Sequence, residues 1–259
     1  MKSVYTGGEK VGEFESYDEL RVGDGKPAFI YEGSELVYPN PVKDGLVLWY
    51  DFSGRTNADG QRGIAEDLSG NGNHGTLQNF NFTAESGYDK NKLLFDGVDD
   101  YGQVETTLST SCSYEVTFKH FENVTWGAPI SSLGNLNPSE GFAITPRATG
   151  IVVSAGDGIG RYSHIYFYNG ALPFDVITHL IVTYDGNVFS LYINGQYISD
   201  EAYNLKQSSL LLFGKWSPVV SGDYNFSGEL YSTRNYNSAL TPEEVAHNYA
   251  IEKERFGIE

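Results

Sequence analysis

Residues 178–195 read THLIVTYDGNVFSLYING, and this stretch decides the fold. Residues 178–184 and 188–193 are rich in β-branched and aromatic side chains, and Asp185-Gly186-Asn187 separates the two runs. Such side chains favour strands, whereas Asp, Gly and Asn tolerate the backbone angles of a tight turn. The stretch therefore predicts an antiparallel hairpin.

The same pattern extends from residue 45 to residue 236, interrupted by clusters of Gly, Asn and Asp. Period-two runs between such clusters are typical of antiparallel strands. We predict strands over residues 46–52, 75–80, 92–95, 101–105, 113–120, 128–133, 142–145, 151–154, 164–168, 178–184, 188–193, 197–198, 210–214 and 226–236. So many strands predict an all-β domain in which two sheets pack together.

One helix is predicted near the C-terminus. Thr241-Pro242-Glu243-Glu244 supplies a capping hydroxyl, a proline at the first helical position and a glutamate at the third, which together form a capping box. Val245 and Tyr249 follow at a spacing of four and form an apolar stripe with Ala246. We expect this helix to pack against the sandwich.

A shift in composition near residue 40 divides the chain. Residues 1–44 are rich in Gly and acidic residues, and two short apolar pieces flank Gly33, which favours a small hairpin. The stiff Pro39-Asn40-Pro41 segment follows. We predict an attachment segment over 1–44, which buries too little surface to be stable alone, and a main domain over 45–259.

Composition excludes several functional classes. The 259 residues carry a formal net charge of −17, which argues against binding to a nucleic-acid backbone. Cys112 is the single cysteine, so neither an intrachain disulfide nor a Cys-x-x-Cys site can form. The sequence shows neither an N-terminal secretory signal nor a run of about 20 apolar residues. We therefore expect a chain made without export and without membrane insertion.

Four motifs occur in the order used by laminin-G-like domains: LVLWY at 46–50, DLSGNGNHG at 67–75, FDGVDDY at 95–101 and YNSALTPEE at 236–244. Residues from about 45 to 255 thus resemble the laminin-G-like members of the concanavalin A-like jelly rolls. The resemblance implies an antiparallel jelly-roll sandwich of two curved sheets with a closing helix. Its functional implication is broader, because this sandwich serves lectins, glycosidases, adhesion domains and viral fibre parts.

The resemblance also implies a calcium ion at the sheet rim, for which Asp67 and Asn71 are the candidate ligands here. An alternative is that the Gly-Asn-Gly-Asn run forms a tight turn without metal. Relatives commonly carry an acidic pair in a Gly-x-Ile-Asp-Glu segment, whereas this chain has GELYS at 228–232. If that pair contributes ligands in relatives, the calcium site here is incomplete.

Enzymatic activity is not expected, and no catalytic residue is predicted. Glycosidases on this sandwich resemble one another in a strand that bears Glu-x-Asp-x-Glu, and this chain lacks that triplet. The five histidines show no metal-ligand spacing, and His74 falls inside the turn motif, where a structural role is expected.

Aromatic residues in loop-like segments are the candidate ligand-binding residues, because sugar rings stack their C–H faces on aromatic rings. The candidates are Trp126, Trp216, Tyr162, Tyr203 and Tyr224. For each of them, packing in the core or at its rim is the alternative interpretation.

The segment YEGSELVY at 31–38 resembles a Tyr-x-Gly-x-x-Leu-Val-Tyr segment of tailed-phage structural proteins. That resemblance implies a phage virion protein, located in the particle, whose residues 1–44 dock to other virion proteins. The jelly roll would then display a face for host-surface glycan. Two alternatives stay open: a purely structural decoration or cement domain, and an accessory carbohydrate-binding module of a bacterial polysaccharide system. A homo-oligomer also stays open, although the chain has no heptad repeat.

Overall fold

The computed structural model describes residues 2–6, 9–14, 29–32, 35–121, 126–134, 139–147, 149–168, 170, 172–220 and 224–259. The chain divides into two compact units, 1–41 and 42–259. The larger unit begins at Val42, whose backbone N–H donates to Asn248 Oδ1 over 2.9 Å. Within the described residues, no helix has the length and apolar character that crossing a bilayer requires.

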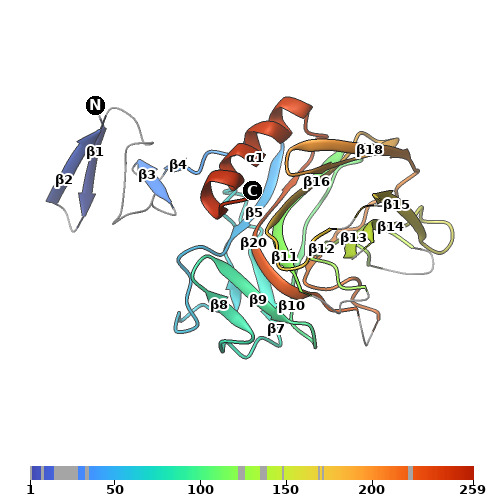
Figure 1. Cartoon of the computed structure of the whole chain (residues 1–259), viewed down its shortest axis with the longest axis horizontal. Helices are drawn as coiled ribbons and strands as arrows, with labels where there is room; N and C mark the ends of the chain where they lie inside the picture. The colour runs from blue at the N-terminus through green and yellow to red at the C-terminus, as the bar shows by residue number, and fades with distance from the viewer. Residues whose placement is uncertain are drawn as a thin grey trace. The chain divides into compact units, whose positions relative to one another are not determined.

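The smaller unit contains two antiparallel strand pairs (Figure 1). Strand β1 (Lys2–Thr6) pairs with β2 (Glu9–Phe14), and β3 (Ile30–Glu32) pairs with β4 (Glu35–Tyr38). The second pair confirms the hairpin predicted around Gly33, although the turn itself lies outside the described residues.

The larger unit is a sandwich of two antiparallel sheets, as predicted. Sheet 1 has the strand order β18 (Gln196–Ala202), β17 (Val188–Ile193), β16 (Thr178–Tyr184), β11 (Cys112–His120), β20 (Ser227–Tyr236), β9 (Lys92–Asp96), β8 (Gly87–Asp89), with β5 (Leu46–Asp51) also on β20. Sheet 2 has the order β15 (Ser163–Tyr168), β14 (Gly150–Ala155), β13 (Phe142–Arg147), β12 (Ile130–Ser131), β19 (Leu210–Phe213), β10 (Tyr101–Glu105), β7 (Gly75–Gln78), β6 (Ile64–Ala65).

The predicted hairpin forms β16 and β17 with the expected bounds, and Tyr184 pairs with Phe189 next to the turn. The strand prediction that is too long by the most residues covers residues 128–133, of which only Ile130–Ser131 form β12. The chain leaves the sheet there because the Ser131 hydroxyl accepts the backbone N–H of Leu133, a local bond that replaces a ladder bond. The short strands β6 and β8 were not predicted, because two or three residues carry no readable period.

The core lies between the two sheets and is rich in aromatic rings. Tyr114 of sheet 1 meets Phe142 of sheet 2 edge-on, with ring centroids 4.1 Å apart. Tyr50 and Phe213 form a tilted contact with ring centroids 5.2 Å apart. These two contacts link the sheets through inward-facing residues, which the period-two runs predict.

The C-terminal helix α1 (Pro242–Phe256) covers the outer face of sheet 1, in red in Figure 1. The predicted capping box is confirmed: Thr241 accepts from the Glu244 backbone, and the Glu244 side chain accepts from the Thr241 backbone. Val245 is buried as predicted, and Gly257 ends the helix in the left-handed region at φ 67°.

Candidate functional site

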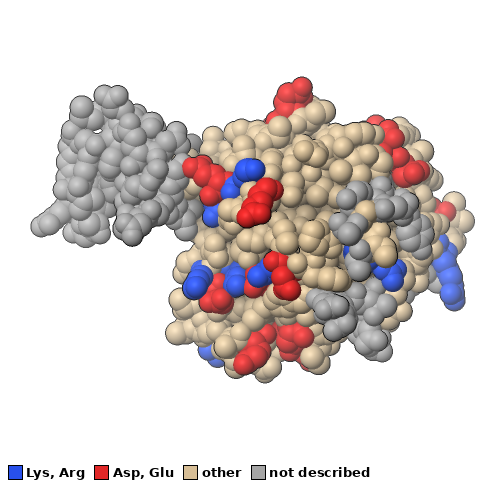
Figure 2. Space-filling model, viewed as in Figure 1, with Lys and Arg blue, Asp and Glu red and all other residues tan. Residues whose placement is uncertain are grey.

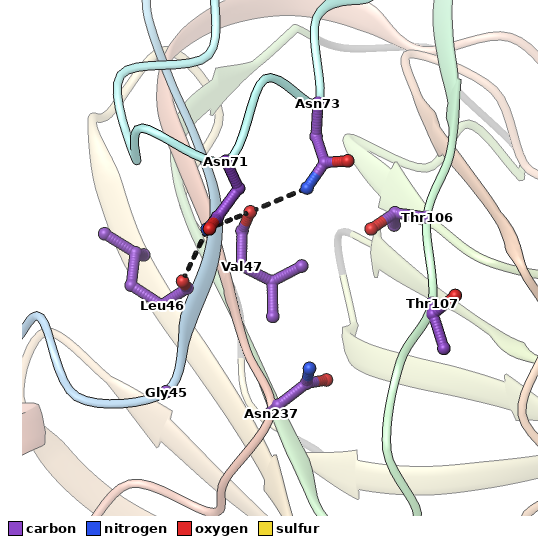
Figure 3. A pocket seen from close by; sticks show the side chains of 8 residues that line it. All are labelled: Gly45, Leu46, Val47, Asn71, Asn73, Thr106, Thr107 and Asn237. Carbon is purple, nitrogen blue, oxygen red and sulfur yellow. Dashed lines mark hydrogen bonds between the residues drawn. The ribbon is translucent and has the colours of Figure 1, made fainter.

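A cavity of about 410 Å³ opens where the two sheets end near the start of β5 (Figure 3). Its lining comes from four segments of the chain, and we call it the asparagine cavity: Gly45, Leu46, Val47, Asn71, Asn73, Thr106, Thr107 and Asn237. Its volume falls within the range of small-ligand sites. No lining residue carries a charge, so the cavity offers amides, hydroxyls and backbone groups only.

Asp67 organises the loop that forms one wall of this cavity. Its Oδ1 accepts the backbone N–H groups of Trp49 and Ser69, each over 3.0 Å. Its Oδ2 accepts from the Ser69 hydroxyl at 2.8 Å and the Asn73 N–H at 2.8 Å. The buried carboxylate therefore ties loop 67–73 to the edge of β5.

The side chains of Asn71 and Asn73 complete the attachment to β5. Asn71 Nδ2 donates to the carbonyl oxygens of Leu46 and Val47 at 2.9 and 3.0 Å, and Asn73 Nδ2 donates to Val47 at 2.9 Å. Because both nitrogens point at the strand, the Asn73 amide oxygen points away from Val47, toward the side of Thr106 (Figure 3). The wall thus presents a hydrogen-bond acceptor to the cavity.

Tyr50 supports this wall from the core. Its hydroxyl donates to the Asn73 carbonyl oxygen over 2.7 Å. Gly75 makes this approach possible, because a Cβ atom there would lie 2.8 Å from the Tyr50 hydroxyl. Burial, and then the nearby Asp67 carboxylate, raise the pKa of Tyr50 far above its usual value, so the phenol stays a donor.

The opposite wall presents hydrogen-bond donors and hydroxyls. Asn237 Oδ1 accepts the Ser109 backbone N–H over 2.9 Å, which leaves Nδ2 as the donating end of the amide. Its side chain points into the space between the labelled residues in Figure 3, and Thr106 and Thr107 line the adjoining side. An acceptor wall and a donor wall therefore face each other across the cavity.

Asn235 lies near the end of β20, two residues before Asn237, which follows the strand. Asn235 is completely buried, and both polar atoms of its amide have no partner among the described residues. Buried amides are nearly always hydrogen-bonded, so Asn235 is an exception to that rule.

The calcium expectation rested on Asp67 and Asn71. Both Asp67 oxygens accept protein hydrogen bonds, and the Asn71 amide nitrogen binds carbonyl groups of β5. These contacts suit a metal-free turn, and a carboxylate that already accepts four hydrogen bonds fits a calcium ion poorly. Calcium at this loop stays a prediction.

Another acidic group lies apart from that loop. Among the described residues, the carboxylates of Asp96, Asp99 and Asp100 come within 4.8 Å of one another. Burial raises the pKa of Asp100 to about 6, and its oxygens accept from Ser86 and from the Asp96 backbone. These bonds explain the FDGVDDY motif as a closed turn between β9 and β10.

Four of the five predicted ring residues gather on the outer face of sheet 2. With His164 they form what we call the aromatic cluster: Trp126, Tyr162, Trp216, Tyr224 and His164. Trp216 is buried, contacts the Tyr162 and Tyr224 rings at 4.9 and 5.4 Å, and donates its indole N–H to Ser154 Oγ over 3.3 Å. This ring is therefore enclosed by protein.

Trp126 is also occupied by protein neighbours. Its ring stacks on His164 with centroids 4.8 Å apart, and the Arg147 guanidinium carbon lies 4.3 Å from the ring centroid. Arg147 is on β13 and His164 on β15, with β14 between these strands. The cluster thus packs on the outer face of sheet 2, and a ligand-binding role for its partly buried rings stays a prediction.

Tyr203, the fifth candidate, lies elsewhere. Its ring packs against the core beside Phe189, and its hydroxyl donates to the Ala155 carbonyl over 2.8 Å. The structure does not bring it into the aromatic cluster.

Sequence analysis missed Asn73, Thr106, Thr107 and Asn237 as cavity residues. Asn73 lies in the DLSGNGNHG motif and Asn237 in the YNSALTPEE motif, and both motifs were interpreted only as indicators of the fold. The available signal was the pair of asparagines in motifs far apart in the chain. No local pattern singles out the two threonines.

Solved structures with the same fold include domain 4 of AbnA, a GH43 extracellular arabinanase from Geobacillus stearothermophilus, in complex with arabinotriose. The TM-score is 0.61 at 18% identity, covering 79% of this chain and 98% of that domain. For the binding domain of a Paraclostridial mosquitocidal protein, the TM-score is 0.56 at 18% identity, and the alignment covers 80% of this chain and 52% of that chain. For Trypanosoma rangeli sialidase in complex with sialic acid, the TM-score is 0.60 at 14% identity, and the alignment covers 83% of this chain and 34% of that chain. At these identities the likeness shows the fold alone.

Among curated proteins, none matches this sequence. The family model Laminin_G_3, described as the concanavalin A-like lectin/glucanases superfamily, matches residues 95–246, which is more than half of the chain. That range runs from the FDGVDDY motif into α1 and includes most strands of both sheets. The antiparallel sandwich with its C-terminal helix agrees with the match, and the chain belongs to the Laminin_G_3 family of concanavalin A-like lectin/glucanase domains.

Proposed function

We propose that the protein binds a neutral carbohydrate in the asparagine cavity. The observation that carries this proposal is the pairing of two walls: the Asn73 amide oxygen faces the cavity on one side, and the Asn237 amide nitrogen on the other. Sugar hydroxyls donate and accept at once, so they match a site that offers both in a fixed arrangement. The fold supports the proposal, because domains of this superfamily include lectins.

We propose that binding occurs without catalysis. Hydrolysis of a glycosidic bond ordinarily needs two carboxyl groups on either side of the bond. The residues that line the asparagine cavity include no carboxylate. The site therefore suits recognition of a sugar, and no residue is assigned a catalytic role.

A glycan array tests the carbohydrate proposal. We expect the full-length chain to bind members of an array of neutral glycans, and Asn237→Ala to weaken that binding about tenfold, because the variant lacks one hydrogen-bond donor. Asn204→Ala, at an exposed position outside the cavity, serves as the matched control. Failure of the folded chain to bind any glycan would overturn the proposal.

For the biological setting, we propose a phage virion protein whose residues 1–44 dock to other virion proteins and whose sandwich faces outward toward host-surface glycan. Two observations support it: the YEGSELVY segment resembles tailed-phage structural proteins, and residues 1–41 form a compact unit separate from the sandwich. A small unit that buries little surface suits an attachment role.

Mass spectrometry of purified particles tests this setting. We expect the chain at a fixed copy number, and we expect a chain without residues 1–41, the smaller compact unit, to stay folded but to be missing from particles. Absence of the full-length chain from particles would refute the virion role and leave the carbohydrate test unaffected.

A further inference from the structure

A second cavity, of about 440 Å³, adjoins the asparagine cavity. Its lining residues are Gly72, Asn73, His74, Thr76, Gln103, Val104, Glu105 and Leu210. Asn73 lines both cavities. The two cavities are therefore adjacent and are separated by the Asn73 side chain.

The two cavities follow the same pair of chain segments. Residues 103–105 line the second cavity and residues 106–107 line the first, while residues 72–76 and 71–73 form the facing side. At about 3.3 Å per strand residue, the stretch from Gln103 to Glu105 extends about 7 Å before β10 ends. The two cavities therefore follow one another along this segment and meet at Asn73, and we call them together the groove.

Side chains of the second cavity point outward from sheet 2. Val104 belongs to the core between the sheets, so its neighbours Gln103 and Glu105 face the other way. Thr76 of β7 pairs directly with Gln103 of β10, which places a hydroxyl beside an amide on that outer face.

His74 supplies a donor with a defined tautomer. Its Nδ1 accepts the Asp67 backbone N–H over 3.1 Å, so the neutral imidazole carries its proton on Nε2. His74 is exposed and lines the second cavity, which places this N–H where a ligand hydroxyl can accept from it.

Charge in the groove selects against acidic ligands. Glu105 is the single acidic residue lining either cavity, and neither lining includes Lys or Arg. A ligand carboxylate would meet the Glu105 carboxylate without a cation to offset the repulsion. The chain as a whole adds to this effect with its net charge of −17.

We infer that the two cavities together bind a neutral, linear oligosaccharide of more than one ring, with Asn73 at the junction between two subsites. This inference rests on the proposed function and extends it to the size and charge of the ligand. One ring occupies the asparagine cavity, and the next lies against His74, Gln103 and Thr76.

An array of immobilised neutral monosaccharides, linear neutral oligosaccharides of increasing length and their sialylated counterparts tests the inference. We expect neutral oligosaccharides to bind, with monosaccharides and sialylated forms at least about tenfold weaker. Asn237→Ala and Gln103→Ala should each weaken binding of the same oligosaccharide about tenfold. The controls Asn204→Ala and Gln196→Ala, exposed positions outside the groove, should leave it unchanged.

Thermal melts of each variant separate a loss of binding from a loss of fold. If Gln103→Ala binds as the unmodified chain does while Asn237→Ala does not, or if monosaccharides or sialylated glycans bind as well as neutral oligosaccharides, the inference is wrong and the proposed function stands. If a folded chain binds none of these glycans, both are wrong.

Discussion

At the scale of single residues, Asp67 shows how one side chain shapes the asparagine cavity. The carboxylate accepts hydrogen bonds from two segments, the β5 edge and the following turn, and so sets the distance between them. Asn71 and Asn73 can reach the β5 carbonyl groups only when that turn is closed. Asp67, which the resemblance implied as a calcium ligand, thus has a structural role in holding this loop against β5.

We predict that Asp67→Ala lowers the free energy of unfolding by about 2–3 kcal/mol, because buried N–H groups lose a charged acceptor. Urea denaturation measures the change. Glu66→Ala, whose exposed carboxylate lies 3.8 Å from Arg55, is the control and should cost at most about 1 kcal/mol. A loss of less than about 1 kcal/mol would contradict this role of Asp67, whereas a calcium-dependent rise in the melting temperature that Asp67→Ala abolishes would support the calcium site that the resemblance implies.

His120 is a buried residue whose two ring nitrogens have no hydrogen-bond partner among the described residues. It packs against Phe118 and Phe174 with ring centroids 6.0 and 5.0 Å away. Burial lowers its pKa to about 4, against a smaller opposing effect of Asp175. Protonation of His120 is therefore unfavourable in the folded state, whereas the unfolded chain binds this proton near the ordinary histidine pKa of about 6.5.

It follows that His120 contributes stability above pH about 6.5 and that this contribution is lost as the pH falls toward 4. We predict that His120→Phe keeps the stability at pH 7 within about 1 kcal/mol, since it removes unpaired polar atoms, and reduces the loss between pH 7 and 4.5. Urea titrations at several pH values measure both. The exposed-site variant His247→Phe should keep the original pH dependence, and an unchanged dependence in His120→Phe would contradict this account.

At the scale of elements, helix α1 is attached to sheet 1 by a buried ionic network. Arg234 of β20 donates to Glu115 of β11 at 2.6 Å and to Glu252 of α1 at 2.7 Å, and all three side chains are completely buried. Glu115 also contacts the His179 ring nitrogen at 2.9 Å, and Asn248 of α1 donates to it at 2.8 Å. The network joins three strands to the helix.

The network also sets a pH dependence. Burial alone would raise the pKa of Glu252, but the guanidinium groups of Arg234 and Arg255 outweigh it and lower the pKa to about 2. Burial likewise opposes ionisation of Glu115, and Arg234 and His179 nonetheless keep its pKa below the usual value. Both carboxylates therefore stabilise the fold above pH about 4.5, and this stability is lost as the pH falls through their lowered pKa values.

We predict that Arg234→Met lowers the free energy of unfolding by about 3–5 kcal/mol at pH 7, because two buried carboxylates lose their partner. The pH at which stability begins to fall should also move upward, since unpaired buried carboxyls protonate more readily. Chemical denaturation between pH 7 and 3 measures both. Lys253→Ala, at an exposed position of α1, is the control, and an Arg234→Met loss of less than about 1 kcal/mol would contradict the role of the network.

Elements differed in how well their sequences predicted them. The β16–β17 hairpin and the cap of α1 were predicted with their bounds because turn chemistry and capping act within a few residues. The length of strand β12 was overestimated because the Ser131 hydroxyl replaces a hydrogen bond of the sheet. The periodicity of the sequence gives no sign of such a local bond. The attachment of α1 through Arg234 could not be predicted, because its partners are far apart in the chain.

At the scale of the whole molecule, one sandwich holds the asparagine cavity and the aromatic cluster as separate features. The cavity combines the start of β5, loop 71–73, residues 106–107 and Asn237, which only the closed fold brings together. For that reason the sequence could not indicate this cavity, whereas it did indicate four of the aromatic residues that pack together on sheet 2. Figure 2 shows charged side chains in small groups on the face in view, some with both signs and some acidic only, without one broad charged patch.

A crystal structure of the full-length protein with the tightest-binding neutral oligosaccharide from the array tests the central claim most directly. We predict a sugar ring in the asparagine cavity, with hydroxyl groups within hydrogen-bond distance of Asn73 Oδ1 and Asn237 Nδ2, and a second ring beside His74. A sugar bound instead against Trp126 and Tyr162 of the aromatic cluster, with the asparagine cavity filled by water alone, would contradict the account.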